Sequence, residues 1–393
     1  MSHSFTYSIL IHYSEIALKL NNRSYFEKKF INNIKQHINS LKYSKINLIA
    51  ARVFIHNINI KDWDIYKDCL KNVMGLQSAT LMIKTNSDIN ELKQASCELI
   101  KNLNFKSFRI STKRQYKQFK HTSNQVNVQI GEYVQLLSKK PVSLNYYEVN
   151  IIIEILRDNS YVGFDKIKGF SGLPTRCQEN TISLISSGID SPVASFEMIK
   201  RGAKIDFVHF HSAPAINKQS IENVKKILNV LTEYQLKSTL YLIPLLKIQQ
   251  KIMQKIPDKY WVIFFRRYMI KIANKLAQQN NAVALITGDS VGQVASQTLS
   301  NLRSVSDASK LPILRPLSGM NKEDIINRAK EIRTYELSIL PYEDCCSFFV
   351  PPHPETKAKM ENIKQLNKKL NLDYLINDAI KNMEVTKFKF GEK

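Results

Sequence analysis

Apolar positions along the chain follow two periods, and their order divides the chain into a smaller α+β part and a larger α/β part. Near the N-terminus, alternation predicts strands at residues 7–12 and 48–60, and helical spacing predicts a helix at 25–38 between them. Similar signals return up to residue 165, with strands expected at 108–112 and 149–154 and a helix at 124–137. The first part is therefore expected to hold two small α+β domains.

From residue 181 onward, short apolar strands alternate with amphipathic helices. The expected strands are 182–185, 203–210, 239–243, 282–287 and 312–314, and the expected helices are 192–201, 221–231, 262–278, 291–299 and one capped by Asn321 and Asp324 that continues to 333. This alternation predicts a parallel sheet with helices on both faces. Because Gly and Pro are dense around 166–174, we expect domains at 1–60, 61–166 and 177–393, with a linker at 167–176.

The first strand of the α/β part ends in a loop of small polar residues, and a helix follows at once. The loop reads Ser186-Ser187-Gly188-Ile189-Asp190-Ser191. Ser191 is expected to cap the helix, and Pro192 suits its first turn because it lacks a backbone N–H. Backbone N–H groups and the positive end of the helix dipole then converge on one point, which favours a bound phosphate. An ordinary strand-to-helix turn is the alternative, and the chain contains neither G-x-x-x-x-G-K-[ST] nor G-x-G-x-x-G.

Three loops that follow predicted strands should meet at one crevice of the sheet. They span residues 186–191, 209–212 and 288–290. Arg266 and Arg267, on a predicted helix, have the forked geometry that binds phosphate in pairs of hydrogen bonds, although a merely basic helix face is the alternative. A metal site at His209 and His211 is not expected.

The balance of charge favours a polyanionic partner. The chain has 57 basic and 34 acidic residues, a formal charge of +23, of which 26 basic and 13 acidic residues precede Cys177. Residues 101–120 contain seven basic residues and no acidic one, interleaved with aromatic residues expected to be mostly core. A proteome rich in lysine is the alternative explanation. The expected RNA-binding residues are Lys106, Arg109, Lys113, Arg114, Lys117 and Lys120.

Five cysteines with no C-x-x-C pair indicate neither a disulfide framework nor a zinc site. No signal peptide or membrane-spanning run is evident, so we expect a soluble cytoplasmic protein that does not bind membranes. Cys345 and Cys346 lie in a proline-rich stretch where a thiolate nucleophile or sulfur carrier is plausible chemistry, opposed by the neighbouring Glu343 and Asp344. A buried cysteine pair is the alternative.

A series of ordered motifs resembles the tRNA 4-thiouridine synthetase (tRNA sulfurtransferase, ThiI) family along nearly the whole chain. The motifs are Glu15-Ile16-Ala17-Leu18-Lys19 with Asn22-Arg23, Lys166-Ile167-Lys168-Gly169 with Gly172-Leu173-Pro174, the loop at 186–191 with Pro192-Val193-Ala194, Lys200-Arg201-Gly202, Val208-His209-Phe210-His211-Ser212, Arg266-Arg267, Gly292-Gln293-Val294-Ala295-Ser296-Gln297-Thr298, Arg315-Pro316-Leu317 and Pro341-Tyr342-Glu343-Asp344-Cys345-Cys346. The resemblance implies an N-terminal ferredoxin-like domain, a THUMP RNA-binding domain and a Rossmann-like PP-loop ATP pyrophosphatase domain.

The resemblance also implies a reaction and its residues. ATP, with Mg²⁺, adenylates the uridine at tRNA position eight, and persulfide sulfur from a cysteine desulfurase then displaces AMP, with a sulfur-carrier protein as a further possible partner. The residues implied to bind ATP are Leu184, Ile185, Ser186, Ser187, Gly188, Ser191, His209, Phe210, Arg266, Gly288 and Gln297. Asp190 is the implied essential acid, and Cys345, with Cys346 second, the implied sulfur carrier. A homodimer, a short form without a rhodanese domain and a role in thiamine biosynthesis are further expectations, and Cys177 is a distant sulfur-carrier candidate.

The chain departs from the PP-loop pattern Ser-Gly-Gly-x-Asp-Ser at one position. Ser187 replaces the first glycine, which strains the loop if that position requires positive φ. A tRNA-binding protein with decayed catalysis is therefore one alternative function. Another PP-loop adenylating enzyme, unrelated to sulfur, is a second.

Overall fold

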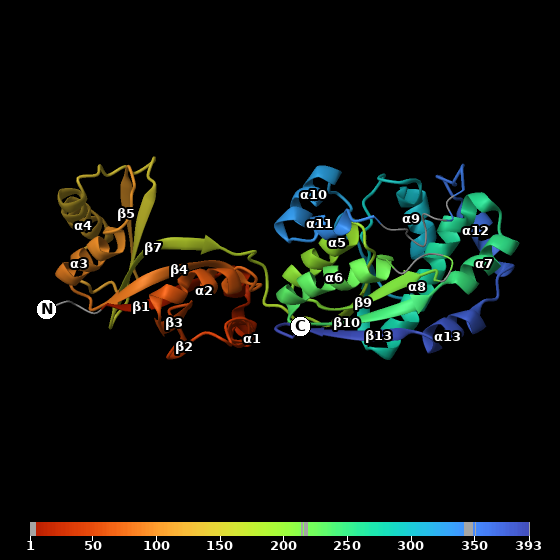
Figure 1. Cartoon of the computed structure of the whole chain (residues 1–393), viewed down its shortest axis with the longest axis horizontal. Helices are drawn as coiled ribbons and strands as arrows, with labels where there is room; N and C mark the ends of the chain where they lie inside the picture. Colours follow the sequence, from red (N-terminus) through yellow and green to blue (C-terminus); the bar gives the residue numbers. More distant parts are fainter. Residues whose placement is uncertain (1–4, 214, 216–218, 342–348, 350, 393) are drawn as a thin grey trace. The chain divides into compact units, whose positions relative to one another are not determined.

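Two compact units, Met1–Leu173 and Pro174–Lys393, each form around their own sheet (Figure 1). The computed structural model describes residues 5–213, 215, 219–341, 349 and 351–392. Within these ranges, none of the helices has both the length and the apolar character needed to cross a membrane.

The first unit is a seven-stranded sheet in the order β2-β3-β1-β4-β7-β6-β5, with helices packed on it. Its elements are β1 (Thr6–Tyr13), η1 (Glu15–Leu18), η2 (Leu20–Asn22), α1 (Arg23–His37), β2 (Lys45–Ile49), β3 (Arg52–Ile58), η3 (Ile60–Asp62), α2 (Trp63–Leu70), β4 (Leu76–Thr85), α3 (Ile89–Ile100), β5 (Phe108–Arg114), α4 (Ser123–Ser138), β6 (Val149–Ile155) and β7 (Ser160–Lys168). The long central strand β4 pairs antiparallel with β1 on one side and with β7 on the other, so one sheet joins the two halves of the unit.

The single strand expected at 48–60 is wrong, because the chain reverses inside it. Ala50 and Ala51 both have positive φ, 47° and 63°, and Ile49 pairs with Arg52 across the turn between β2 and β3. This is the two-residue hairpin turn whose twist matches that of the strands, but it normally carries Asn or Gly. Pairing of the flanking apolar residues overrides the poor fit of alanine to this turn.

A buried carboxylate shows how strongly the first sheet bends. Glu154 on β6 is fully buried, and its Oε2 lies 3.2 Å from Nη2 of Arg52 on β3, while His12 Nε2 lies 3.7 Å from Oε1. β3 and β6 are four places apart in the sheet, which is about 19 Å in a flat sheet. The sheet therefore curls so that these strands face each other across Phe54 and Tyr161, whose ring centroids are 4.5 Å apart.

The second unit has a six-stranded sheet in the order β12-β11-β8-β9-β10-β13. Its elements are β8 (Asn180–Leu184), α5 (Asp190–Lys200), β9 (Lys204–His211), α6 (Gln219–Gln235), β10 (Lys237–Pro244), α7 (Leu246–Lys255), η4 (Asp258–Tyr260), α8 (Trp261–Gln279), β11 (Ala282–Ile286), η5 (Ala295–Gln297), α9 (Leu299–Ser306), β12 (Ile313–Leu314), α10 (Lys322–Glu331), α11 (Tyr335–Ser338), α12 (Met360–Lys368), α13 (Asp373–Lys381) and β13 (Glu384–Lys389). The expected parallel strands are present, but β13 adds an antiparallel edge strand that the sequence pattern did not predict, so the sheet is mixed.

Helices cover both faces of this second sheet. α5 and α6 pack on one face, and α7, α8 and α13 pack on the other, where the largest apolar cluster lies. The strand order reverses at β8, since β9 and β10 follow it on one side and β11 and β12 on the other. A crevice is expected where the order reverses, at the carboxyl ends of β8 and β11.

The Glu154 ion pair generates a stability prediction. Glu154→Gln should lower the free energy of unfolding by about 3 to 5 kcal/mol, because it leaves the nearly buried guanidinium of Arg52 without its countercharge. Thermal and urea unfolding measure the change. Exposed Glu132→Gln on α4 is the control and should have little effect. Equal stability of the two variants would show that the ion pair contributes nothing.

Candidate functional site

The loop after β8 is closed by its own serine side chains. Ser191 Oγ accepts a hydrogen bond from the Ser186 N–H at 2.8 Å and lies 3.1 Å from Ser186 Oγ. The expected N-cap role of Ser191 is wrong: α5 begins at Asp190, and the preceding residue, Ile189, makes no side-chain cap. Ser191 instead fixes the curvature of the loop, while Asp190 occupies the first turn, where the helix dipole stabilises a negative charge.

Ser187 is accommodated without the expected backbone strain. Its φ is not among the positive values of the described residues, so the position does not require glycine. The side chain is 1% exposed, and its Oγ has no hydrogen-bond partner within the described part of the chain. The cost of the replacement is therefore a buried hydroxyl, not a distorted loop.

Gly288 is the position where glycine is required. A Cβ at this residue would lie 2.7 Å from the backbone nitrogen of Ser191 and 2.8 Å from its Cα. Both groups are backbone, so neither can move aside as a flexible side chain would. The end of β11 thus packs directly against the loop that follows β8.

A cavity of about 250 Å³ lies at the carboxyl ends of β8, β9 and β11. Of the residues expected to bind nucleotide or act as the acid, it is lined by Leu184, Ile185, Ser186, Asp190, Ser191, His209, Phe210, Arg266, Gly288 and Gln297. Ser187 and Gly188 are in the loop but do not line the cavity. Five lining residues were not predicted: Val262, Met269, Thr287, Asp289 and Ser296.

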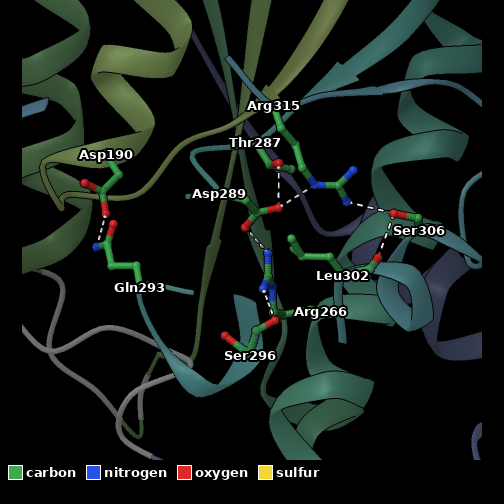
Figure 2. Close-up of polar contacts among 9 residues, drawn as sticks. All are labelled: Asp190, Arg266, Thr287, Asp289, Gln293, Ser296, Leu302, Ser306 and Arg315. Carbon is green, nitrogen blue, oxygen red and sulfur yellow. Dashed lines mark hydrogen bonds and ion pairs between the residues drawn. The ribbon is translucent and has the colours of Figure 1, made fainter. Parts of the chain in front are cut away.

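Asp289 is the electrostatic centre of this cavity (Figure 2). Its buried carboxylate contacts the Arg266 guanidinium through Oδ1, and its Oδ2 accepts hydrogen bonds from Arg315 Nε at 3.0 Å and Thr287 Oγ1 at 2.8 Å. Burial raises the pKa of Asp289, but Arg266, Thr287 and Arg315 together outweigh burial, and the pKa lies below the usual 3.8. Asp289 is therefore ionised at neutral pH, and two guanidiniums around one carboxylate leave a net positive charge.

Arg266 and its neighbour have different roles. Arg266 lines the cavity, and its Nη1 donates to the Ser296 carbonyl at 3.1 Å (Figure 2). Arg267 is buried, donates to the Ser304 carbonyl and pairs with Asp307 at 3.0 Å. Arg267 is not a lining residue, so only Arg266 of the two arginines faces this cavity.

The segment after Gly288 is a folded loop, so the helix expected at 291–299 is wrong. Gly292 has φ of 79°, its N–H donates to the Gln297 carbonyl at 3.0 Å, and only the short η5 follows before α9. This loop supplies Ser296 and Gln297 to the wall of the cavity. Gln293 Nε2 donates to Asp190 Oδ2 at 2.9 Å (Figure 2).

A lysine that the sequence did not point to completes the surroundings of Asp190. Lys322, the first residue of α10, places its Nζ 2.5 Å from Asp190 Oδ1. The expected cap of this helix is present, since Asn321 Oδ1 accepts the Asp324 N–H at 2.8 Å. The cap fixes the start of α10 and thereby places Lys322 beside the loop.

Known families and structures match this arrangement. Family models match over residues 8–80 (ThiI ferredoxin-like domain), 86–165 (THUMP domain) and 176–372 (thiamine biosynthesis protein, ThiI). A probable tRNA sulfurtransferase from Thermoanaerobacter pseudethanolicus is 38% identical over 94% of this chain and 97% of its own. One from Bacillus pumilus is 36% identical over 96% of this chain and 94% of its own. The chain belongs to the ThiI family.

A solved ThiI-type structure extends this likeness to three dimensions. A 4-thiouridine synthetase in complex with RNA and ATP matches with a TM-score of 0.87 and 32% identity, over 98% of this chain and all of that one. The protein PH1313 from Pyrococcus horikoshii, 19% identical with a TM-score of 0.62 over 83% of this chain and 99% of its own, shares the fold. The expected order of a ferredoxin-like, a THUMP and a PP-loop domain is confirmed.

His209 is a neutral histidine in the wall of the ThiI cavity. It is 2% exposed, burial lowers its pKa to about 4, and its Nδ1 lies 2.9 Å from the Ile185 carbonyl, which fixes Nδ1 as the protonated nitrogen. Nε2 is then an acceptor, and it has no partner among the described residues. A ligand with an N–H or O–H donor would satisfy it.

The residues expected to bind RNA all lie in the first unit, but their side chains differ in exposure and in their contacts with the rest of the protein. Lys106, Lys113, Lys117 and Lys120 are exposed. Arg114 Nη1 donates to the Phe119 and His121 carbonyls at 3.1 and 2.9 Å and so holds the loop after β5. The Arg109 guanidinium stacks over Tyr147, 4.1 Å from the ring centroid. Phe105 and Phe108 are buried, as expected for core aromatics.

The sulfur-carrier candidates Cys345 and Cys346 lie outside the described residues. Cys177 is buried. Within the described ranges there is no group of three or more His, Cys, Asp or Glu side chains that would hold a metal by themselves.

The depressed pKa of His209 predicts an acid-sensitive unit. The unfolded chain binds a proton near pH 6.5 and the folded chain only near 4, so stability is complete above about pH 6.5 and falls as pH drops toward 4. The difference amounts to about 3 kcal/mol. His209→Asn, which keeps a donor toward Ile185, should flatten this slope in unfolding measured from pH 4 to 7. Exposed His353→Gln is the control, and an unchanged slope in His209→Asn would contradict the prediction.

The contact at Gly288 predicts a local packing defect. Gly288→Ala should destabilise the second unit by about 1 to 3 kcal/mol, because the new methyl group collides with the Ser191 backbone. Gly319→Ala is the matched control, since a Cβ there has no atom within 4 Å. Thermal unfolding compares the two, and the same Tm for both would mean that the loop yields without cost.

Proposed function

We propose that this chain is an ATP-dependent tRNA sulfurtransferase that converts uridine at tRNA position eight to 4-thiouridine. The carrying observation is the cavity at the carboxyl ends of β8 and β11, where a PP-loop, Arg266 and the Asp289 cluster meet. The family membership and the tRNA sulfurtransferase names of its relatives support the same activity.

ATP fits the chemistry of this cavity. The apolar side chains of Leu184, Ile185 and Phe210 offer a surface for the adenine, and His209 Nε2 offers an acceptor for its amino group. The net positive charge around Asp289 and the N-terminus of α5 attract the triphosphate. We assign Arg266 to the phosphates and the loop at 186–191 to the pyrophosphate. The related 4-thiouridine synthetase structure contains ATP.

Asp190 is our candidate ligand for Mg²⁺. This ion is usually held by one or two carboxylates together with substrate phosphates, so a single carboxylate at the loop suits it and a dedicated metal cluster is not needed. When bound, the ion neutralises charge on the phosphates of the leaving pyrophosphate. Lys322 and Gln293 hold the carboxylate in place until then.

The reaction has two displacements. The uridine O4 attacks the α-phosphorus of ATP, pyrophosphate leaves and an O-adenylated uridine forms. The terminal sulfur of a persulfide on the carrier then attacks C4 and AMP leaves, with Cys345 as the proposed carrier and Cys346 second. A second thiol attacks the carrier sulfur, which forms a disulfide with it and releases 4-thiouridine. We propose a cysteine desulfurase as the persulfide donor, a possible sulfur-carrier protein between them, a homodimeric assembly and a cytoplasmic location. The exposed lysines of the first unit, with Arg109 and Arg114 as supports, are the proposed tRNA contacts.

Mass spectrometry of tRNA nucleosides tests this function. A strain lacking the gene should lose 4-thiouridine, and the wild type should restore it. Asp190→Asn and one of Cys345→Ser or Cys346→Ser should reduce restoration at least a hundredfold, since each removes a group used in the chemistry. Cys177→Ser and Ser187→Gly are controls expected to restore it. Persistence of 4-thiouridine in the deletion strain would refute the activity.

Two alternative functions predict different results. If the protein only binds tRNA, purified protein will release no AMP from ATP in the presence of tRNA and a persulfide donor. The negative φ of Ser187 removes the strain that motivated this alternative. If the protein is a PP-loop enzyme unrelated to sulfur, both cysteine variants will be as active as the wild type.

A further inference from the structure

The second unit, Pro174–Lys393, here called the catalytic unit, contains another cavity. It lies at the opposite end of the sheet from the cavity at the carboxyl ends of β8, β9 and β11, which is called the nucleotide cavity below. It has a volume of about 380 Å³ and is formed at the amino ends of β9 and β10, together with β13. Lys204, at the start of β9, lines this cavity, whereas His209 of the same strand lines the nucleotide cavity. Five residues of strand separate them, or about 17 Å, so the two cavities are distinct.

Basic side chains dominate this amino-end cavity. Arg176, Lys204, Lys237, Lys387 and Lys389 line it, against the acidic Asp206 and Glu392. Lys389 pairs with Glu392 at the rim. Asp206 lies near Arg176, which leaves an excess of positive charge contributed by three strands and the segment before β8.

The arrangement of these cations is unfavourable in the protein alone. In the antiparallel pair of β10 and β13, Lys237 lies directly opposite Lys389, and Lys387 lies opposite Thr239. Like charges directly opposite each other destabilise a sheet. A solvated lysine face would avoid this pairing, whereas a bound anion would compensate for it.

Arg176, one of the basic residues that line this cavity, has an unfavourable backbone conformation. Arg176 has φ of 60°, a left-handed conformation that is uncommon for residues other than glycine. In this conformation its Nη1 donates to the Lys237 carbonyl at 3.2 Å. Burial lowers the pKa of Arg176, with Asp206 opposing the shift, so its charge is partly withdrawn from water and acts strongly on a ligand in the cavity.

We propose that this amino-end cavity binds phosphate groups of the RNA backbone and extends the RNA contact of the enzyme onto the catalytic unit. Lys387 and Lys389 alternate on one strand, about 6.8 Å apart, a separation comparable to that of consecutive phosphates along an RNA strand. Ammonium groups bind phosphate as point charges without reading sequence. The choice of RNA as the source of phosphate rests on the proposed function.

The test is RNA binding as a function of salt. The double variant Lys387→Gln/Lys389→Gln is compared with the full-length wild type for a tRNA transcript by fluorescence anisotropy. Each lost contact should lower the slope of log K against log salt by about 0.7 to 0.9, and should weaken binding about fivefold at 0.15 M salt. Because the cavity is remote from the nucleotide, kcat at saturating tRNA should not change.

A matched control separates local contact from net charge. Lys364→Gln/Lys368→Gln on α12 removes the same two charges from exposed positions outside the cavity and should leave the slope as in the wild type. Lys237→Gln is a second cavity variant that removes the like-charge pair, so it should fold at least as well as the wild type and still bind RNA less tightly. Circular dichroism verifies folding of every variant.

Other outcomes overturn the inference. Equal salt slopes for the cavity and control variants would exclude an RNA contact here. If inorganic phosphate then raised the Tm of the wild type but not of the cavity variant, the cavity would belong to a small anion; without that effect, an acidic protein surface would remain the candidate. A wild type that bound no tRNA at all would refute the proposed function itself, which the cavity variants alone cannot do.

Discussion

The catalytic unit depends on one constraint, the close approach of two backbone segments at the point where the strand order of the sheet reverses. The chain at Gly288 and the loop at Ser191 are too near for even a methyl group between them. This contact sets the distance between the ends of β8 and β11, and the cavity is the space that remains beside it. It also fixes where Asp289, one residue further on, emerges from the strand. Any shift that separated the two backbones would move the loop and the charge cluster apart together.

The Asp289 cluster shows how a site can be positively charged and still rigid. Two free guanidiniums facing one cavity would repel each other and sample many rotamers. A buried carboxylate between Arg266 and Arg315 removes part of that repulsion and gives each arginine a fixed partner, while Ser296 and Ser306 accept further hydrogen bonds. The net positive charge that remains on this cluster is therefore held in a fixed position. If the proposed function is correct, a ligand phosphate would be attracted without the entropy cost of ordering the arginines afterwards.

The sequence predicted what depends on local pattern, and it failed where distant groups decide the structure. The apolar run and small polar residues at 182–191 predicted a strand, loop and helix because those signals are local. The resemblance to ThiI supplied most of the lining residues. The two arginine partners of Asp289 and the place of Lys322 could not be predicted, since they join positions from 23 to 132 residues apart. The turn at Ala50–Ala51 and the edge strand β13 arise from tertiary pairing that overrides weak local preferences.

If the proposed chemistry occurs, the Asp190 carboxylate has to interact with a bound cation as well as with Lys322. In the structure its carboxylate is neutralised by Lys322 and held by Gln293, which keeps an acidic group stable beside a loop built for anions. If Asp190 takes up a cation, that cation competes with the Lys322 ammonium for the same carboxylate. An ammonium displaced from Asp190 would remain beside the loop, where it would attract the phosphates of a bound nucleotide. The exchange would then leave the net charge at the loop unchanged.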